Sequence, residues 1–312
     1  MTQHEHAASM AHLFLLLAIF VSSGVMQPLL ISELGYNGAY DRSTLLFLLP
    51  NYVGMSFAGL LRANVFSTGI FRWRQLVVLC AVDVFSQFLC QYGLSVAGSS
   101  LYIIMYSSSV VWIAILSRLV LGRKLAPTQW LGCCVVVGGL AITGGNLAVS
   151  LSGTSHLDIA VGGLMILLGS ASHAFTWVLC EQVLKQPNPV LPEALSAFMG
   201  FAGVATFSSW QLVYTWPRAD ELISKPIASH GGHTLAIAAA YVILTVASLA
   251  HAVTFYHLVG QMGCVTAGVS KGTQAVAVFV FSHVLYCGAQ ESQCMGRCDE
   301  PASSFASLCL LS

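Results

Sequence analysis

Lys271 lies inside an apolar stretch, residues 265–286, that is long enough to cross a lipid bilayer. An ammonium group at that depth costs about 2.5–3.5 kcal/mol on insertion scales, so such a lysine normally faces a water-filled cavity or an anion. Lys271 is therefore the first candidate for a ligand-binding residue, and an anionic group is the partner that it predicts.

Three polar side chains in the stretch 76–96 share one helical face. Asp83, Gln87 and Gln91 follow one another at intervals of four residues, which places them on the same side of an α-helix. A carboxylate and two amides would not face lipid. The stripe therefore either lines a cavity or joins neighbouring helices through buried hydrogen bonds.

His251 is a third ionisable group inside an apolar stretch, residues 235–258. Asp83, His251 and Lys271 each lie roughly 10 Å from the cytosolic end of their helices at helical rise, so we expect them to meet. Lys271 would bind an anion while Asp83 or His251, the latter titrating near neutral pH, exchanges a proton or a competing ion pair. The alternative is a static structural ion pair between Asp83 and Lys271.

Other residues are candidates with an equally good packing explanation. Tyr106 suits a ring-containing ligand or a packed core. His173 and Trp177 lie one turn apart and either line the cavity or form a satisfied core pair, and Asn51 follows Pro50 at a hinge or a kink. The candidate set for substrate binding is Lys271, Asp83, Gln87, Gln91, Tyr106, Gln274, His251, Asn51 and His173.

Motifs for enzymatic chemistry are missing from the sequence. It holds no Asp-rich prenyl-diphosphate motif, no His-Glu-x-x-His, no phosphate-binding P-loop and no convincing Ser/His arrangement. His230 and His233 form a His-x-x-His pair without a third ligand. We therefore expect no enzyme activity, no metal and no cofactor.

The composition makes the bilayer the solvent of this chain. Of 312 residues, 56% are hydrophobic and only 8% are charged, against about 25% in soluble domains. The net charge of zero gives no reason to expect nucleic acid as a partner. Apolar runs of suitable length predict nine membrane-spanning helices, at residues 13–31, 44–61, 76–96, 101–121, 130–147, 159–183, 194–214, 235–258 and 265–286.

Lys and Arg residues predict the orientation of these spans. With the N-terminus in the cytosol, the inner loops hold Arg62, Arg72, Arg74, Arg118, Arg123, Lys124 and Lys185, and the outer segments hold only Arg42, Arg218, Lys225 and Arg297. Because cytoplasmic loops carry the excess of positive charge, a cytosolic N-terminus is favoured.

A weak internal repeat suggests a two-fold design. A shift of 165 residues pairs Gly98 with Gly263 and Ser117 with Ser282. Repeats of five spans run in opposite orientations, so we expect an all-α polytopic membrane protein made of two inverted repeats of about five helices. The expected organisation is a cytosolic tail at 1–12, a first repeat at 13–149, a second repeat of four spans at 159–286 and a divergent tail at 287–312.

The repeat also predicts a tenth span that the sequence does not supply. After Gly288 the chain continues with polar residues and ends in a short Ser-rich tail that cannot cross a membrane. We therefore expect the tenth helix to be lacking. The glycine-rich face of the fifth span would then face lipid or another subunit.

Residues 107–119, 121–125 and 129–132, with the pair Gly138-Gly139, resemble the EamA-like part of the drug/metabolite transporter superfamily, most closely the branch of nucleotide-sugar and chloroquine-resistance-type transporters. The resemblance implies ten helices in two inverted repeats around a central cavity. It also implies alternating access, often with exchange. Residues 267–271 are similar to the Gly-Ala-Leu-Asn-Lys element in which a lysine contacts a nucleotide, with Ser270 in place of the asparagine.

The function expected from residues and resemblance is secondary transport of a small organic metabolite, by exchange or ion coupling. The alternative is a truncated membrane protein that does not transport alone or that associates with a full-length partner. Expected partners are a small substrate, anionic if Lys271 binds it, and membrane lipids, with a homodimer as a further possibility. An endomembrane (Golgi, endoplasmic reticulum or vacuole) is favoured over the plasma membrane.

Overall fold

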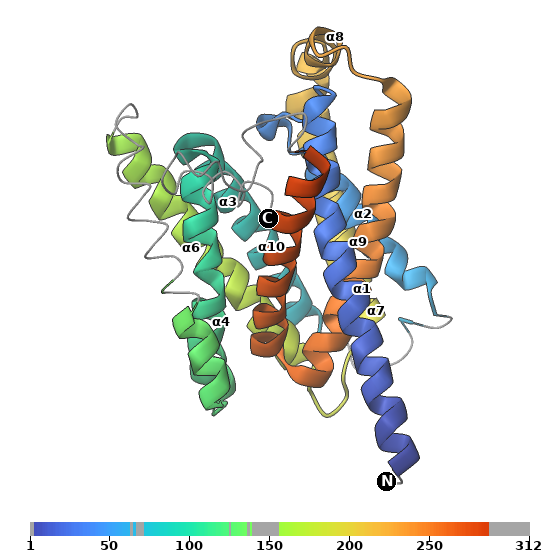
Figure 1. The fold of residues 1–312 in the computed structure, drawn as a ribbon, viewed down its shortest axis with the longest axis vertical. Helices are drawn as coiled ribbons and strands as arrows, with labels where there is room; N and C mark the ends of the chain where they lie inside the picture. Colours follow the sequence, from blue (N-terminus) through green and yellow to red (C-terminus); the bar gives the residue numbers. More distant parts are fainter. Residues whose placement is uncertain are drawn as a thin grey trace. The chain divides into compact units, whose positions relative to one another are not determined.

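The computed structural model describes residues 3–62, 65–66, 72–124, 126–135, 138 and 156–286, and the regular elements among them are all helical (Figure 1). The predicted all-α class is therefore confirmed. The α-helices are α1 (Gln3–Tyr36), α2 (Leu49–Phe57), α3 (Trp73–Ser107), α4 (Ser109–Leu121), α6 (His156–Leu184), α7 (Pro192–Trp210), α8 (Lys225–Ser229), α9 (Thr234–Met262) and α10 (Cys264–Tyr286).

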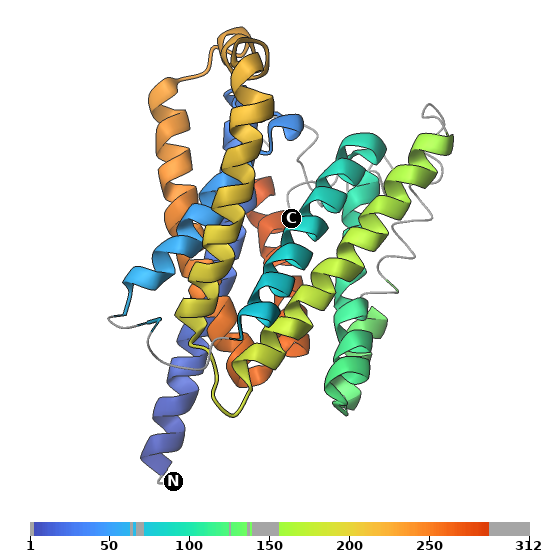
Figure 2. The same ribbon diagram turned by 180° about the vertical axis from the view of Figure 1, so that it is seen from behind.

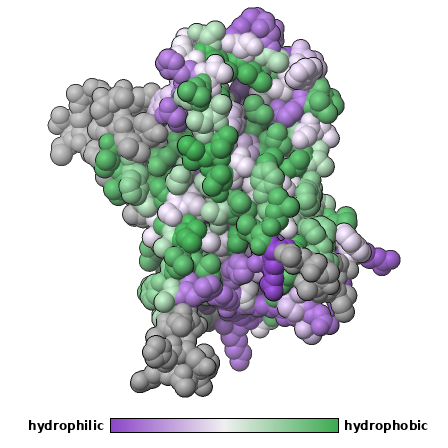
Figure 3. Space-filling view, turned by 90° about the vertical axis from the view of Figure 1, so that its right-hand side faces the viewer, coloured by the Kyte–Doolittle hydropathy of each residue, from purple (hydrophilic) through white to green (hydrophobic). Residues whose placement is uncertain are grey.

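Four of these helices are long and apolar enough to cross a membrane, as judged from the described residues: Met10–Tyr36, Trp73–Ala97, Ile159–Leu184 and Thr234–Met262. Shorter apolar helices cover Leu46–Leu60 and Met105–Leu121. Hydrophobic residues also cover much of the face drawn in Figure 3. The chain is a multi-pass membrane protein. The greater part of the predicted fifth span and the predicted tail at 287–312 lie outside the described residues.

The predicted second span, 44–61, is not one helix. Leu45 has a left-handed backbone (φ 54°) between two 3₁₀ turns, and α2 begins only at Leu49. Pro50 is the second residue of α2, where its missing N–H costs no intrahelical hydrogen bond. The prediction of a hinge or a kink at Pro50 inside a helix is therefore wrong, because Pro50 lies in the first turn of α2.

The helices group into two compact units, and each unit combines segments from both halves of the sequence. The first unit comprises Met1–Cys80 and Cys180–Gln274, and the second comprises Ala81–Leu179 and Ala275–Ser312. The first unit therefore holds α1, α2, α7 and α9 with the beginning of α10. The second holds most of α3 and α6 together with α4.

In the first unit, α9 packs against α1 and α2, and α2 also packs against α7 (Figure 2). Glycines make these contacts close. A Cβ on Gly54 would overlap the backbone carbonyl oxygen of Thr245 in α9, and one on Gly200 would overlap the backbone of Ser56. Small residues at such crossings are how helices associate in a membrane, where apolar surface alone gives little drive.

In the second unit, α3 and α6 pack against each other in antiparallel register. A Cβ on any of three glycines at this contact would lie 2.5–2.6 Å from a side-chain atom of the other helix. The contacting residues are Cys90 with Gly169, Gly93 with Ile166 and Ala97 with Gly162. The residue numbers thus rise along α3 while they fall along α6.

The chain reverses direction inside α3. Leu101 packs beside Ala97 and Ile166, and the ring of Tyr106 lies 5.7 Å from that of His173. From Leu101 to Tyr106 the chain thus runs parallel to α6, whereas before Ala97 it runs antiparallel. The predicted reversal between the third and fourth spans is confirmed. The fourth span itself continues past a break at Ser108 into α4.

The Gly54–Thr245 contact predicts a measurable loss of stability. Gly54→Ala would force α2 away from α9 because the obstacle is backbone rather than a flexible side chain, and overpacking of this kind costs about 1–3 kcal/mol. We expect a lower melting temperature of the detergent-purified protein. Gly272→Ala is the control, since nothing lies within 4 Å of its Cβ position. Equal melting temperatures for the two variants would contradict the close packing of α2 on α9.

Candidate functional site

The candidate residues fall into two sets, one in each unit. Four belong to the first unit: Asn51, His251, Lys271 and Gln274. Five belong to the second unit: Asp83, Gln87, Gln91, Tyr106 and His173. The expected meeting of Asp83 with Lys271 and His251 therefore joins residues of different units, and it stays a prediction.

In the first unit, the backbone carbonyl of Phe20 joins three helices. Gln274 of α10 donates from Nε2 to this oxygen at 2.8 Å, and Nδ1 of His251 in α9 lies 3.1 Å from it. The Phe20 ring also stacks on the His251 ring, with centroids 4.5 Å apart and an interplanar angle of 15°. Two of the candidate side chains are thus held on one backbone atom of α1.

These bonds fix the tautomer of His251. A carbonyl oxygen only accepts, so Nδ1 must carry a hydrogen. Ser23 Oγ, 3.3 Å from the same Nδ1, donates its own hydrogen to the Ile19 carbonyl at 2.6 Å and can accept from the imidazole. Of the two ring nitrogens, Nδ1 is thus engaged by Phe20 and Ser23.

Gly24 makes the contact between α1 and α10 possible. A Cβ at this position would lie 2.5 Å from Cδ and Nε2 of Gln274. Sequence reasoning missed Phe20, Ser23 and Gly24. The short small-residue run Ser22-Ser23-Gly24 within the first apolar stretch was the available signal.

Lys271 lies three residues before Gln274 on α10, a spacing that puts both on one helical face. Its ammonium group also interacts electrostatically with His251. The structure therefore brings together Lys271, His251 and Gln274, three of the residues predicted to bind substrate.

Glu181, at the end of α6, holds the beginning of α10. Its side chain is buried, with Oε1 accepting from Lys185 Nζ at 2.8 Å and Oε2 accepting from the backbone N–H of Cys264 at 2.8 Å. Cys264 is the first residue of α10, whose leading N–H groups have no partner inside the helix. The spacing of four residues favours the pair with Lys185, whereas no sequence pattern indicates the bond to Cys264.

Asn51 takes part in helix packing. Ser248, buried in α9, donates to Asn51 Oδ1 at 2.6 Å. This bond joins α2 to α9 three residues before the close approach at Gly54. The contact explains Asn51 without a ligand.

In the second unit, aromatic rings form a continuous row. Tyr102 stacks on Tyr106 with centroids 5.3 Å apart, and Tyr106 is followed by His173 and Trp177 at 5.7 and 5.8 Å. Trp177 Nε1 donates to His173 Nε2 at 3.2 Å. Because an accepting nitrogen carries no hydrogen, this bond requires His173 to be unprotonated at Nε2.

The polar stripe of α3 is buried but incompletely bonded. Asp83 and Gln91 are 7% and 8% exposed, and Asp83 interacts electrostatically with Tyr106. Gln91 Oε1 is buried and has no hydrogen-bond partner among the residues that the structure describes. A stripe that served only to join helices would be expected to satisfy this acceptor.

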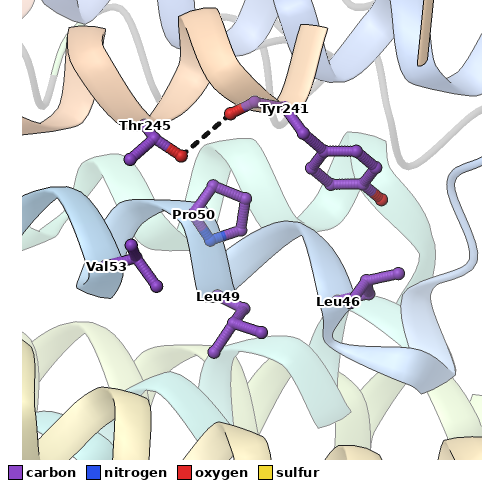
Figure 4. A pocket seen from close by; sticks show the side chains of 6 residues that line it. All are labelled: Leu46, Leu49, Pro50, Val53, Tyr241 and Thr245. Carbon is purple, nitrogen blue, oxygen red and sulfur yellow. Dashed lines mark hydrogen bonds between the residues drawn. The ribbon is translucent and has the colours of Figure 1, made fainter. Parts of the chain in front are cut away.

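A pocket of about 230 Å³ lies elsewhere, between the beginning of α2 and α9 (Figure 4). No residue of the candidate set lines it. Its lining is almost wholly apolar and consists of Leu46, Leu49, Pro50, Val53, Tyr241 and Thr245, the hydroxyl of Thr245 being bonded to the Tyr241 carbonyl at 2.9 Å. Within the described ranges, no group of three or more His, Cys, Asp or Glu could hold a metal ion.

Comparison with known proteins gives a family for the first part of the chain. Residues 10–145 match the model of the EamA-like transporter family. The chain is also similar to solute carrier family 35 member F6 of Mus musculus, at 26% identity over 113 residues, and to the same protein of Rattus norvegicus, at 25%. Each alignment covers 35% of this chain and 30% of the relative.

The resemblance to the drug/metabolite transporter superfamily is confirmed by these matches. The matched range, residues 10–145, includes the segments 107–119 and 129–132 that carry the resemblance in the sequence.

The Glu181 contact predicts a difference between two substitutions. Glu181→Leu leaves Lys185 and the Cys264 N–H without their partner, and removal of one member of a buried polar contact costs about 1–3 kcal/mol. Glu181→Gln keeps an acceptor for the Cys264 N–H and loses mainly the ion pair with the partly exposed Lys185. Its melting temperature should therefore lie much closer to that of the wild type than the melting temperature of Glu181→Leu does. A Gln variant as unstable as the Leu variant would show that the Lys185 ion pair, rather than the bond to α10, carries the stability.

Proposed function

We propose that this protein is a secondary transporter that moves a small organic metabolite across a membrane by alternating access. The family match over residues 10–145 and the similarity to a solute carrier support transport as the activity. The observation that carries the proposal is the joint position of Lys271, His251 and Gln274 on apolar helices of the first unit. No enzymatic role is proposed.

Lys271 is the binding residue in this proposal. An ammonium group within an apolar helix is stable when it faces an anion or water, so a carboxylate, phosphate or sulfate group of the substrate is its partner. His251 takes up or releases a proton at Nε2, the nitrogen that the Phe20 carbonyl leaves available. Two positive charges repel, so a protonated His251 and a charged Lys271 destabilise each other when no anion is bound. Anion binding at Lys271 and protonation of His251 are therefore coupled.

The chain contains no P-loop for ATP. Uphill movement would therefore use an exchange or ion gradient. We place the N-terminus in the cytosol because of the Lys and Arg distribution, and the protein in an endomembrane because of the family resemblance. Lipids and a small substrate are the proposed partners, with association into a homodimer as a further proposal.

The test is binding and counterflow with Lys271→Gln. Purified protein is screened by thermal stabilisation against nucleotides, phosphorylated sugars, amino acids and organic cations, since a ligand that binds only the folded state raises apparent stability. An anion that stabilises the protein is then followed by counterflow in proteoliposomes. We expect the variant to lose about 10–100-fold in anion affinity, as befits a lost charge-assisted hydrogen bond.

Lys225→Gln is the matched control, because the Lys225 side chain is 68% exposed and lies in α8, outside the long apolar helices. It should bind and transport the anion as the wild type does. Unchanged anion affinity in Lys271→Gln would remove the anion site. Folded protein that binds the anion but shows no counterflow would instead favour the non-transporting alternative.

A further inference from the structure

The polar stripe and the aromatic row of the second unit lie in register. On α6, Gly169 marks the level of Cys90 and Ile166 marks that of Gly93, so residues earlier on α3 lie beside residues later on α6. One further turn along each helix places Gln87 at about the level of His173, and the next turn places Asp83 near that of Trp177. The two features therefore run side by side along α3 and α6.

The returning end of α3 completes the arrangement. Tyr106 lies against His173 and interacts electrostatically with Asp83, although 23 positions separate the two residues along the chain. In a straight helix that separation is about 35 Å. The reversal after Ala97 thus brings an aromatic phenol back to the acidic end of the stripe.

Gln91 supplies an independent observation. Its side chain is more than nine-tenths buried, and within the described part of the chain Oε1 has no hydrogen-bond partner. An unsatisfied buried acceptor is costly. A ligand that brings an N–H donor to this oxygen would satisfy it.

From this geometry we infer that the second unit contains a binding site for a planar aromatic ring that carries an ammonium group, an arylalkylamine being the simplest member of the class. The inference deepens the proposed transport function and rests on it for its biological role. The ring lies against Tyr102 and Tyr106, and its donor bonds to Gln91 Oε1 or to the Asp83 carboxylate.

The chemistry of the lining favours an amine over an acid. Residues 81–107 and 156–179 contain no Lys or Arg, whereas they present a carboxylate, amide oxygens and the faces of aromatic rings. Ring faces attract cations and the edges of other rings. Trp177 Nε1–H, a donor that an anion could use, is already bonded to His173.

Three probes distinguish the contribution of the aromatic ring to binding from that of the charge. Tryptamine has the ring and the ammonium group, indole-3-acetate has the same ring with a negative charge, and hexylamine has the ammonium group without a ring. Their dissociation constants are measured by equilibrium dialysis with the detergent-purified full chain. We expect tryptamine to bind at least about tenfold more tightly than either of the others. Equal affinity for tryptamine and indole-3-acetate, or for tryptamine and hexylamine, would overturn the inference.

Gln91→Leu tests the assigned acceptor without unfolding the protein. The substitution removes the unsatisfied oxygen at similar volume, so the melting temperature should stay or rise, while tryptamine binding weakens about tenfold, as for one lost hydrogen bond. Tyr106→Leu should also weaken binding, and Tyr106→Phe should retain it because the ring face remains. Tyr92→Leu, on the same helix but 57% exposed, is the matched control. Unchanged tryptamine affinity in both Gln91→Leu and Tyr106→Leu would contradict the site.

These outcomes are distinct from a failure of the transport proposal. Tryptamine binding that depends on Gln91, in a protein without counterflow, would support this site and contradict transport. Counterflow of an anion through a protein that shows no preference for tryptamine would support transport and overturn this site.

Discussion

The absence of a Cβ atom at a few positions decides where the helices of this protein meet. Apolar surface gives helices little reason to associate in lipid, so backbone proximity and buried hydrogen bonds must determine their contacts. Gly54 and Gly200 set α2 against α9 and α7, and Gly162 and Gly169 set α6 against α3. The candidate site residues depend on the same condition, since Gln274 reaches the Phe20 carbonyl only because position 24 is glycine.

Some buried polar groups of this protein are fully bonded and others are not. In the first unit, the Phe20 carbonyl receives Gln274 and His251, and both oxygens of Glu181 accept hydrogen bonds. Among the described residues, buried acceptors without a hydrogen-bond partner occur in both units, at Gln91 Oε1 of the second and at Glu193 Oε2 and Gln211 Oε1 of the first. A satisfied network holds side chains in one arrangement, whereas an unsatisfied group lowers the cost of exchanging neighbouring packing for a ligand. The contacts around Phe20 and Glu181 thus have fixed geometry, whereas Gln91 offers unused bonding capacity.

The sequence predicted the elements that follow from helical periodicity and from the cost of charge in lipid. The helical class, the reversal after the third span and the proximity of Lys271 to His251 are of this kind, because each depends on spacing along one helix or on depth. The break at Leu45 and the start of α2 beside Pro50 depended on local backbone geometry, which an apolar run does not reveal. The contacts of Phe20 and Cys264 use main-chain atoms, so no residue type in the sequence indicates them.

The position of Lys271 follows from the Glu181 contact as much as from α10 itself. Lys271 lies seven residues after Cys264, which is about two helical turns or 10 Å. Over so short a distance an α-helix moves as a rigid rod, so a displacement of the Lys271 ammonium group along the helix axis displaces the Cys264 N–H equally. A displacement of Lys271 along the helix axis must therefore either break the bond to Glu181 or carry the end of α6 with it.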